Sequence, residues 1–290
     1  MDYSSEKGQK TMKQIFYLCI YVVSIASGAI AATISPASFC LEKFDIGMNM
    51  DLGIRFKMSN VQNIGPIDLN VRKPAANKVI QGYIPIPDSS WFYFLNPQIV
   101  PGKNGVASAK MFLKVPNENK YLNQHWAVHV AAKPPSVSLF TMEMVGVYMI
   151  ETRSSRKVTE KPYGKLGIVP SRVYVQNIKP QQKIPASFVV YNNDKIPHDY
   201  TISVHTFTPS KYTKLQISQA PGFEWIKDIK WIQIAQTLLS IPANQKKESS
   251  VWITIPKKVQ YANEGFEAII MVKSNKEGGP TGFTRLLISF

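Results

Sequence analysis

Two stretches of the sequence decide the fold because they are copies of one pattern. Residues 82–133 read GYIPIPDSSWFYFLNPQIVPGKNGVASAKMFLKVPNENKYLNQHWAVHVAAK, and residues 222–273 read GFEWIKDIKWIQIAQTLLSIPANQKKESSVWITIPKKVQYANEGFEAIIMVK. Each begins with Gly-aromatic, reaches a tryptophan nine residues later, continues to an apolar-Pro pair 25 residues beyond it, and closes on a lysine. Only Pro101 and Pro242 are out of step, by a single residue. Landmarks that stay in register over about fifty residues indicate an internal duplication.

Both copies alternate in polarity as half-buried strands do. The odd positions of residues 251–255 are aliphatic, and residues 111–115 are apolar at the matching positions. Period-two alternation is typical of a strand with one face on a core, and the proline that follows each run ends the strand. The strands are short and no amphipathic helix is convincing. We therefore predict an all-β chain with two tandem immunoglobulin-like β-sandwich domains.

The duplication also sets the expected domain boundaries. The segments upstream of the repeat match more loosely, and the second copy needs an insertion within residues 205–221. We expect a first module at 33–150, a short polar linker at 151–163 and a second module at 164–290.

The N-terminus has the features of an export signal. Lys7, Lys10 and Lys13 precede an uncharged apolar run at residues 15–31, which ends in the small-x-small pattern of a cleavage site. We expect residues 1–31 to be a signal peptide cleaved after Ala31, and the protein to be periplasmic or on the cell surface. The alternative is an uncleaved membrane anchor, since the run is just long enough to span a bilayer.

Composition and charge restrict the partners. A hydrophobic fraction of 44% and a charged fraction of 18% are those of a folded chain, and the formal net charge is +15. In an exported protein this surplus favours an anionic envelope polysaccharide or a protein subunit of an envelope or surface assembly, including a second copy of the chain. Nucleic acid is a poor partner for that compartment. Scattered lysines that only keep the protein soluble are the alternative.

The sequence offers no convincing catalytic, cofactor or metal site. Cleavage would leave Cys40 as the single cysteine, so no internal disulfide can form, and an intermolecular bridge is the alternative to a buried apolar role. His125 and His129 would lie roughly 13 Å apart on a strand, too far to share a metal ion. Nucleophile elbows and phosphate-binding glycine loops are absent. We therefore expect a non-enzymatic protein.

Two groups of apolar residues are candidate partner-binding positions. Phe112 and Trp252 occupy matching outward positions of the two copies, where a large aromatic favours a contact surface unless a neighbour covers it. The apolar segment at residues 141–150 is either an inner strand or an edge strand that pairs with another chain. Trp91 and Trp231 are expected to pack on the two cores.

The order of these landmarks resembles the immunoglobulin-like or fibronectin-III-like modules of bacterial surface and periplasmic proteins. In outline the chain is also similar to periplasmic pilus chaperones, which have two such domains and an apolar strand before the interdomain region. That likeness implies strand donation to a fibre subunit and basic anchors nearby; the positions concerned are Met142, Met144, Val145, Val147, Arg153 and Arg156. The two domains of that family differ from each other, whereas these modules are near repeats, and the chain lacks the family's cleft Arg and Lys pair; both features depart from that pattern.

Two functional hypotheses follow. The first is a structural or adhesive component whose tandem modules contact another subunit or an anionic polymer. The alternative is an assembly chaperone that donates the last strand of the first module.

Overall fold

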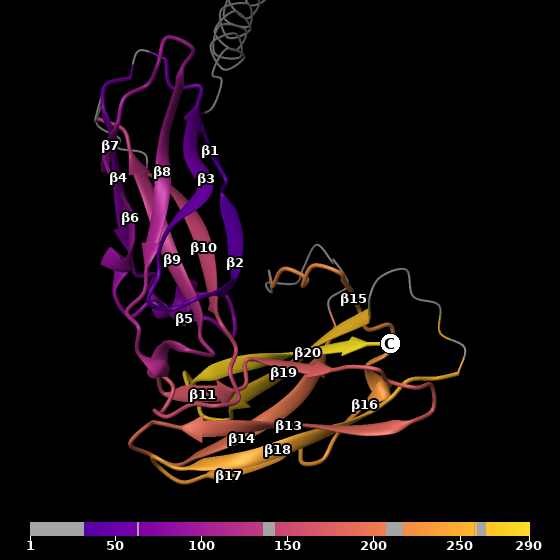
Figure 1. Cartoon of the computed structure of the whole chain (residues 1–290). Coiled ribbons are helices and arrows are strands. Elements are labelled where there is room, and N and C mark those ends of the chain that lie inside the picture. The colour runs from indigo at the N-terminus through magenta and orange to yellow at the C-terminus, as the bar shows by residue number, and fades with distance from the viewer. Residues whose placement is uncertain (1–31, 63, 136–142, 207–216, 258, 260–264) are drawn as a thin grey trace, which may run out of the picture.

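The computed structural model describes residues 32–290 apart from 63, 136–142, 207–216, 258 and 260–264 (Figure 1). In that part of the chain the regular structure is β-sheet, with four short 3₁₀ turns. The strands form two β-sandwiches, so the prediction of an all-β chain with two sandwich domains is confirmed. The proposed signal peptide, residues 1–31, and Met142 lie outside the described residues.

Module 1 is a four-stranded sheet packed on a six-stranded sheet. The four-stranded sheet has the order β1 (Thr33–Ser35), β3 (Asn49–Ser59), β8 (Val106–Lys114) and β6 (Phe92–Phe94). The six-stranded sheet has the order β2 (Ser38–Phe44), β10 (Met144–Thr152), β9 (His125–Lys133), β4 (Ile67–Arg72) and β7 (Gln98–Ile99), and β5 (Ile84–Pro85) pairs with β9. The chain therefore changes sheets between β1 and β2.

Module 2 repeats this topology strand for strand. Its four-stranded sheet has the order β11 (Leu166–Val169), β13 (Lys183–Asn192), β18 (Lys246–Thr254) and β16 (Ile232–Ile234). Its six-stranded sheet has the order β12 (Arg172–Val175), β20 (Thr281–Ser289), β19 (Gly265–Ser274), β14 (His198–His205) and β17 (Leu238–Ile241), and β15 (Phe223–Trp225) pairs with β19. The 3₁₀ turns η2 (Ser89–Trp91) and η4 (Ile229–Trp231) also match, whereas η1 (Ala76–Lys78) and η3 (Asn119–Tyr121) belong to module 1.

Each sandwich has its own apolar core, built from the alternating inward positions. Met111 and Leu113 of β8 are fully buried, as are the matching Val251 and Ile253 of β18. Trp91 packs against the first core and Trp231 against the second, as predicted. Removing apolar surface of this size from water stabilises each module without a disulfide.

The two sandwiches meet in an L, with one end of module 1 standing on the outer face of β19 and β20 (Figure 1). A third apolar cluster fills the contact and contains Tyr83, Ala127 and Met149 of module 1 with Ile269 and Phe283 of module 2. The modules are therefore packed on each other as well as tethered.

The connection between the modules is more structured than the predicted linker. Glu151 and Thr152, its first two predicted residues, are buried members of β10. The side chain of Asn123 then accepts hydrogen bonds from the backbone N–H groups of Ser155 and Ser171, both at 2.9 Å. One amide thus ties the end of module 1, the connection and the start of module 2 together.

Candidate functional site

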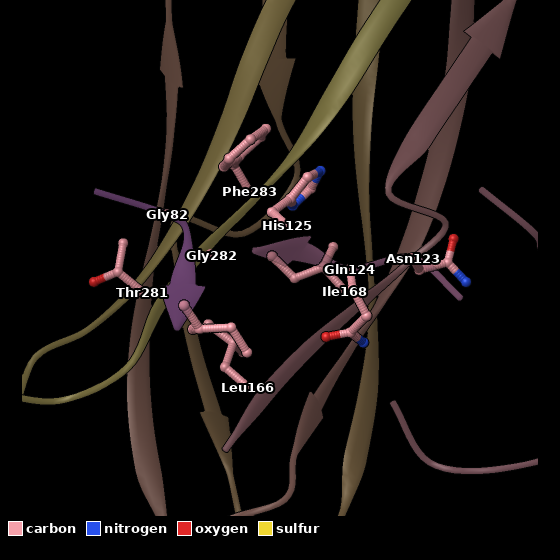
Figure 2. Close-up of a pocket in the computed structure, with 10 residues that line it drawn as sticks. Gly82, Asn123, Gln124, His125, Leu166, Ile168, Thr281, Gly282 and Phe283 are labelled. Carbon is pink, nitrogen blue, oxygen red and sulfur yellow. The ribbon is translucent and has the colours of Figure 1, made fainter. Parts of the chain in front are cut away.

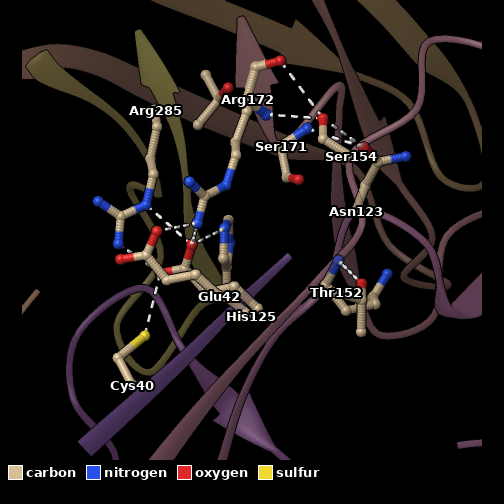
Figure 3. Close-up of polar contacts among 12 residues, drawn as sticks. Cys40, Glu42, Asn123, His125, Thr152, Ser154, Ser171, Arg172 and Arg285 are labelled. Carbon is tan, nitrogen blue, oxygen red and sulfur yellow. Dashed lines mark hydrogen bonds and ion pairs between the residues drawn. The ribbon is translucent and has the colours of Figure 1, made fainter. Parts of the chain in front are cut away.

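Glu151 is the centre of a buried charge cluster between the modules. Its carboxylate accepts hydrogen bonds from Arg172 Nη2 at 2.6 Å and from Arg285 Nε at 2.8 Å and Nη2 at 2.6 Å. The hydroxyl of Tyr83 donates a further bond to it at 2.7 Å. Figure 3 shows the two arginine side chains pointing into the same cluster. Because β10 supplies the acid and β12 and β20 supply the bases, the ion pairs join module 1 to module 2.

The cluster reaches a second carboxylate and the end of the insertion in module 2. Arg285 Nη1 donates to Glu267 and, at 2.8 Å, to the carbonyl of Ser218. The other oxygen of Glu267 accepts from the backbone N–H of Ala220 at 2.6 Å. The predicted insertion, which lies partly outside the described residues, therefore ends in the contact between the modules.

Glu42 completes the cluster at its rim. Arg172 Nη2 lies 2.9 Å from Glu42 Oε2, and the side chain of Glu42 is 15% exposed, whereas that of Arg172 is 1% exposed. Three carboxylates thus share two guanidinium groups. Such a cluster holds two surfaces in one geometry, because removing either arginine leaves buried carboxylates without their counter-charge.

The protonation states follow from burial and charge. Burial opposes ionisation of Glu151, but the charges and hydrogen bonds of Arg285, with Arg172 and His125, hold its pKa well below the usual carboxyl value. Burial lowers the pKa of His125 to about 4, so this imidazole, 3.9 Å from Glu151, is neutral at neutral pH. Burial and the charge of Glu151 raise the pKa of the Cys40 thiol to about 12, so the thiol is unreactive.

The apolar half of the contact is closely packed. The rings of Phe283 and His125 stack at 3.9 Å between centroids (Figure 2). The ring centroid of Tyr83 lies 5.4 Å from that of Phe283. Gly82 has φ +92°, and a Cβ there would lie 2.5 Å from a ring carbon of Phe283. The cavity beside these residues holds only about 30 Å³, room for a single water molecule. We call these aromatic residues, Gly82 and the charge cluster the interdomain seam; it fixes geometry and leaves no space for a partner.

The predicted donor strand, β10, is partly paired on both sides. β9 pairs with it over its full length from Met144. On the other side β2 pairs with it only from Val147 onward, where the N–H of Val147 donates to the carbonyl of Ala37 at 2.9 Å. No strand of the described residues pairs with residues 144–146 on that side. We call this short backbone segment the open edge. From Val147 onward the strand is paired on both sides, and pairing of residues 144–146 with another chain stays a prediction.

The side chains at the open edge are apolar and half-buried. Met144 packs against the core of module 1, Val145 lies on the outer face, and Val147 packs against the cluster between the modules. Arg153 and Arg156 lie beyond the strand and are exposed; Arg153 pairs with Asp45 at 3.2 Å. The structure therefore brings neither arginine into the buried charge cluster.

Phe112 and Trp252 lie on the outer faces of the two four-stranded sheets, opposite the cores, as the alternation indicates. Phe112 stacks on Tyr93 of the neighbouring strand with centroids 5.4 Å apart. The ammonium of Lys183 lies 5.0 Å above the ring of Trp252. Both aromatics are half-buried by these neighbours, and their role as a contact surface stays a prediction.

Sequence reasoning missed the charged residues of the interdomain seam. A usable signal existed, because Glu267 and Arg285 interrupt apolar strands, and a charge at such a position must find a buried partner. The identity of that partner depends on how the modules pack, which the repeat pattern does not encode.

The described residues include neither a candidate metal site nor a candidate membrane-spanning helix. Within the described ranges, no three His, Cys, Asp or Glu residues are grouped so that they could hold a metal ion. Nor does any helix in that part of the chain have the length and apolar character needed to span a membrane.

No protein-family model and no curated protein matches the chain. Solved structures similar to it include a protein of unknown function from Porphyromonas gingivalis W83, with 10% identity, coverage of 89% of this chain and 99% of that one, and a TM-score of 0.34. The class 5 fimbriae chaperone CfaA has 13% identity, coverage of 88% and 99%, and a TM-score of 0.31. The CsuC–CsuE chaperone–tip adhesion subunit pre-assembly complex of Acinetobacter baumannii has 11% identity, coverage of 90% and 100%, and a TM-score of 0.30. The likeness spans both domains, but at these scores it assigns no role to this chain.

Proposed function

We propose that this chain is an exported, non-enzymatic binding protein that captures an extended segment of another protein by strand addition at the open edge, as an assembly chaperone does. The observation that carries the proposal is the incomplete pairing of β10, in which residues 144–146 have β9 on one side and no described strand on the other. An unpaired strand edge with apolar side chains is a template for another strand.

The direction of the backbone groups supports this mode of binding. Val147 donates its N–H toward β2, and strand geometry points the N–H and C=O of every second residue to the same side. The N–H and C=O of Val145 therefore point to the open side. A partner strand would bond to Val145 and would cover the half-buried side chain of Met144.

The interdomain seam supports the proposal in a second way. A partner that binds to module 1 meets a fixed surface only if module 2 keeps its orientation relative to module 1. The buried ion pairs of Glu151 with Arg172 and Arg285 hold the two arms in one arrangement, so the partner meets a preorganised surface and less ordering entropy is lost on binding.

Two substitutions at one position test the proposal. Val145→Pro removes the N–H on the open side and keeps the bonds to β9, whereas the control Val145→Thr keeps that N–H. With a photo-crosslinking residue at position 144 in the native cells, we expect an extended partner segment to be crosslinked in the wild-type and Thr chains and lost in the Pro chain. Equal crosslinking in all three, with folding intact, would contradict strand addition.

A structural or adhesive role is the second candidate, and the recurrence of a half-buried outer aromatic in both modules favours it. Purified envelope polysaccharide should then sediment with the chain, and Phe112→Ala combined with Trp252→Ala should weaken that binding. Unchanged binding in the double variant would remove the aromatics from this candidate function.

A further inference from the structure

A pocket on the outer face of module 1 lies apart from the interdomain seam and the open edge's backbone. It is lined by residues of β4, η1, β9 and β10 and by the segment that joins β4 to η1; these are Arg72, Lys73, Ala75, Lys78, His129, Val145 and Val147. We call it the outer pocket.

The strand register sets the arrangement of its floor. Arg72 stands directly opposite His129, and His129 directly opposite Val147. Paired residues of antiparallel strands lie about 5 Å apart, so these three side chains form one row across the sheet. The floor is apolar at the β10 end of the row and cationic at the β4 end.

His129 is the unusual member of this row. It is only 7% exposed, and its Nε2 is buried with no hydrogen-bond partner among the described residues. Leaving such a group unpaired is unfavourable, and buried polar atoms in proteins nearly always have a partner. Burial, with the charges of Arg72 and Lys78, lowers the pKa of His129, so the ring is neutral at neutral pH. A neutral imidazole can donate one N–H to an oxygen that enters the pocket.

Of the three cationic side chains around His129, only Arg72 has a carboxylate at ion-pair distance among the described residues. Arg72 forms a bidentate pair with Glu143, at 3.0 and 2.8 Å. Lys73 and Lys78 are exposed, and no carboxylate within the described ranges lies at ion-pair distance from either. Two lysines without an ion pair and a histidine whose Nε2 has no hydrogen-bond partner therefore line the same pocket.

We propose that the outer pocket binds a phosphate monoester, with Lys73 and Lys78 matching its two negative charges, His129 donating a hydrogen bond to one oxygen, and Val145 and Val147 contacting the esterified carbon chain. A phosphate monoester is close to a dianion at neutral pH and offers three strong acceptor oxygens, which suits two cations and one neutral donor. The ester is carried either by a soluble molecule or by a lipid, and both present the same group to the pocket.

The test uses the full-length chain and glycerol 3-phosphate as the probe. Calorimetry should show saturable binding, and the ring resonances of His129 should shift on titration. Lys78→Met and His129→Ile should each weaken the binding roughly tenfold, the effect of losing one charge-assisted hydrogen bond. Isoleucine is chosen because module 2 has Ile269 at the matching place, so the substitution is compatible with the strand. The control Lys114→Met, on the other sheet, should bind as the wild type does.

Vesicles of phosphatidylcholine with and without phosphatidic acid distinguish the source. Binding to phosphatidic acid vesicles but not to glycerol 3-phosphate, with loss in Lys78→Met, assigns the phosphate to a lipid. Binding to the soluble ester with the same loss assigns it to a soluble molecule. The proposal is overturned if neither probe binds, if methyl sulfate binds equally well, or if Lys78→Met and Lys114→Met behave alike.

Discussion

The two modules have the same strands, but the outer face of the six-stranded sheet carries different kinds of residue in each. On the outer face of the six-stranded sheet, the register places the charged residues of module 2 where module 1 has small or apolar ones: Arg172, Glu267 and Arg285 stand at the places of Ser38, Ala127 and Val147. The duplication therefore explains the fold, and the departures from it explain how the copies join.

The open edge of module 1 also has a counterpart in module 2. In module 2, β12 pairs with β20 only from Arg285 onward, and the N–H of Arg285 donates to the carbonyl of Ser171 at 2.9 Å, as Val147 donates to Ala37 in module 1. The part of β20 that precedes Arg285 carries Phe283, which is 1% exposed and packs against His125 and Tyr83 of module 1. Module 1 thus packs over this part of module 2, while the matching segment of module 1 has β9 on one side and no described strand on the other.

Glu151→Ala should lower the free energy of unfolding more than the other substitutions, because it removes the centre of the contact between the modules. It leaves Arg172 and Arg285 without their shared carboxylate, and removing one partner from a buried ion pair costs about 3–5 kcal/mol. Urea unfolding of the full chain measures the loss. A change below about 1 kcal/mol would mean that water already reaches the cluster.

Acidification should weaken the seam through His125. Its pKa is about 4 in the folded chain against the ordinary 6.5, so the unfolded chain binds the extra proton first and stability falls as the pH drops from about 6.5 to 4. The full effect is on the order of 3 kcal/mol. Glu151, whose pKa is held low, adds a further loss as the pH falls through the ordinary carboxyl pKa and below it, because the unfolded chain takes up that proton first. Unfolding free energies of wild type and His125→Gln across this range test it: the variant should be flatter, and parallel curves would contradict the assignment.

Gly82→Ala should lower the free energy of unfolding more than the same substitution at Gly53, where the added methyl group has space. Both Gly82 and Gly53 have positive φ, +92° and +68°, but a Cβ at Gly82 meets Phe283 at 2.5 Å, whereas one at Gly53 meets nothing within 4 Å. The backbone cost, about 1 kcal/mol, is common to both; the clash adds about 1–3 kcal/mol at Gly82 alone. Thermal unfolding of the pair checks this, and equal destabilisation would mean that the seam relaxes around the added methyl group.

The fold could be predicted from the sequence because the strand alternation and the turn glycines are local patterns that occur in both copies. Alternation around Met111 and Val251, and a glycine with positive φ at positions 82 and 222, recur in each copy. The end of the linker and the role of Glu151 could not be predicted in this way. A glutamate after an apolar strand looks solvated until another domain covers it, and the two arginines of that domain lie 21 and 134 positions along the chain.

The most direct test of the account is hydrogen exchange on the full chain, purified with its partner from its own cells and again after the partner is removed. We predict that backbone amides at residues 143–147 are protected in the complex and exchange faster in the freed chain, while the matching amides at 281–285 stay protected in both. Partner-dependent protection elsewhere, with none at residues 143–147, would contradict capture at the open edge.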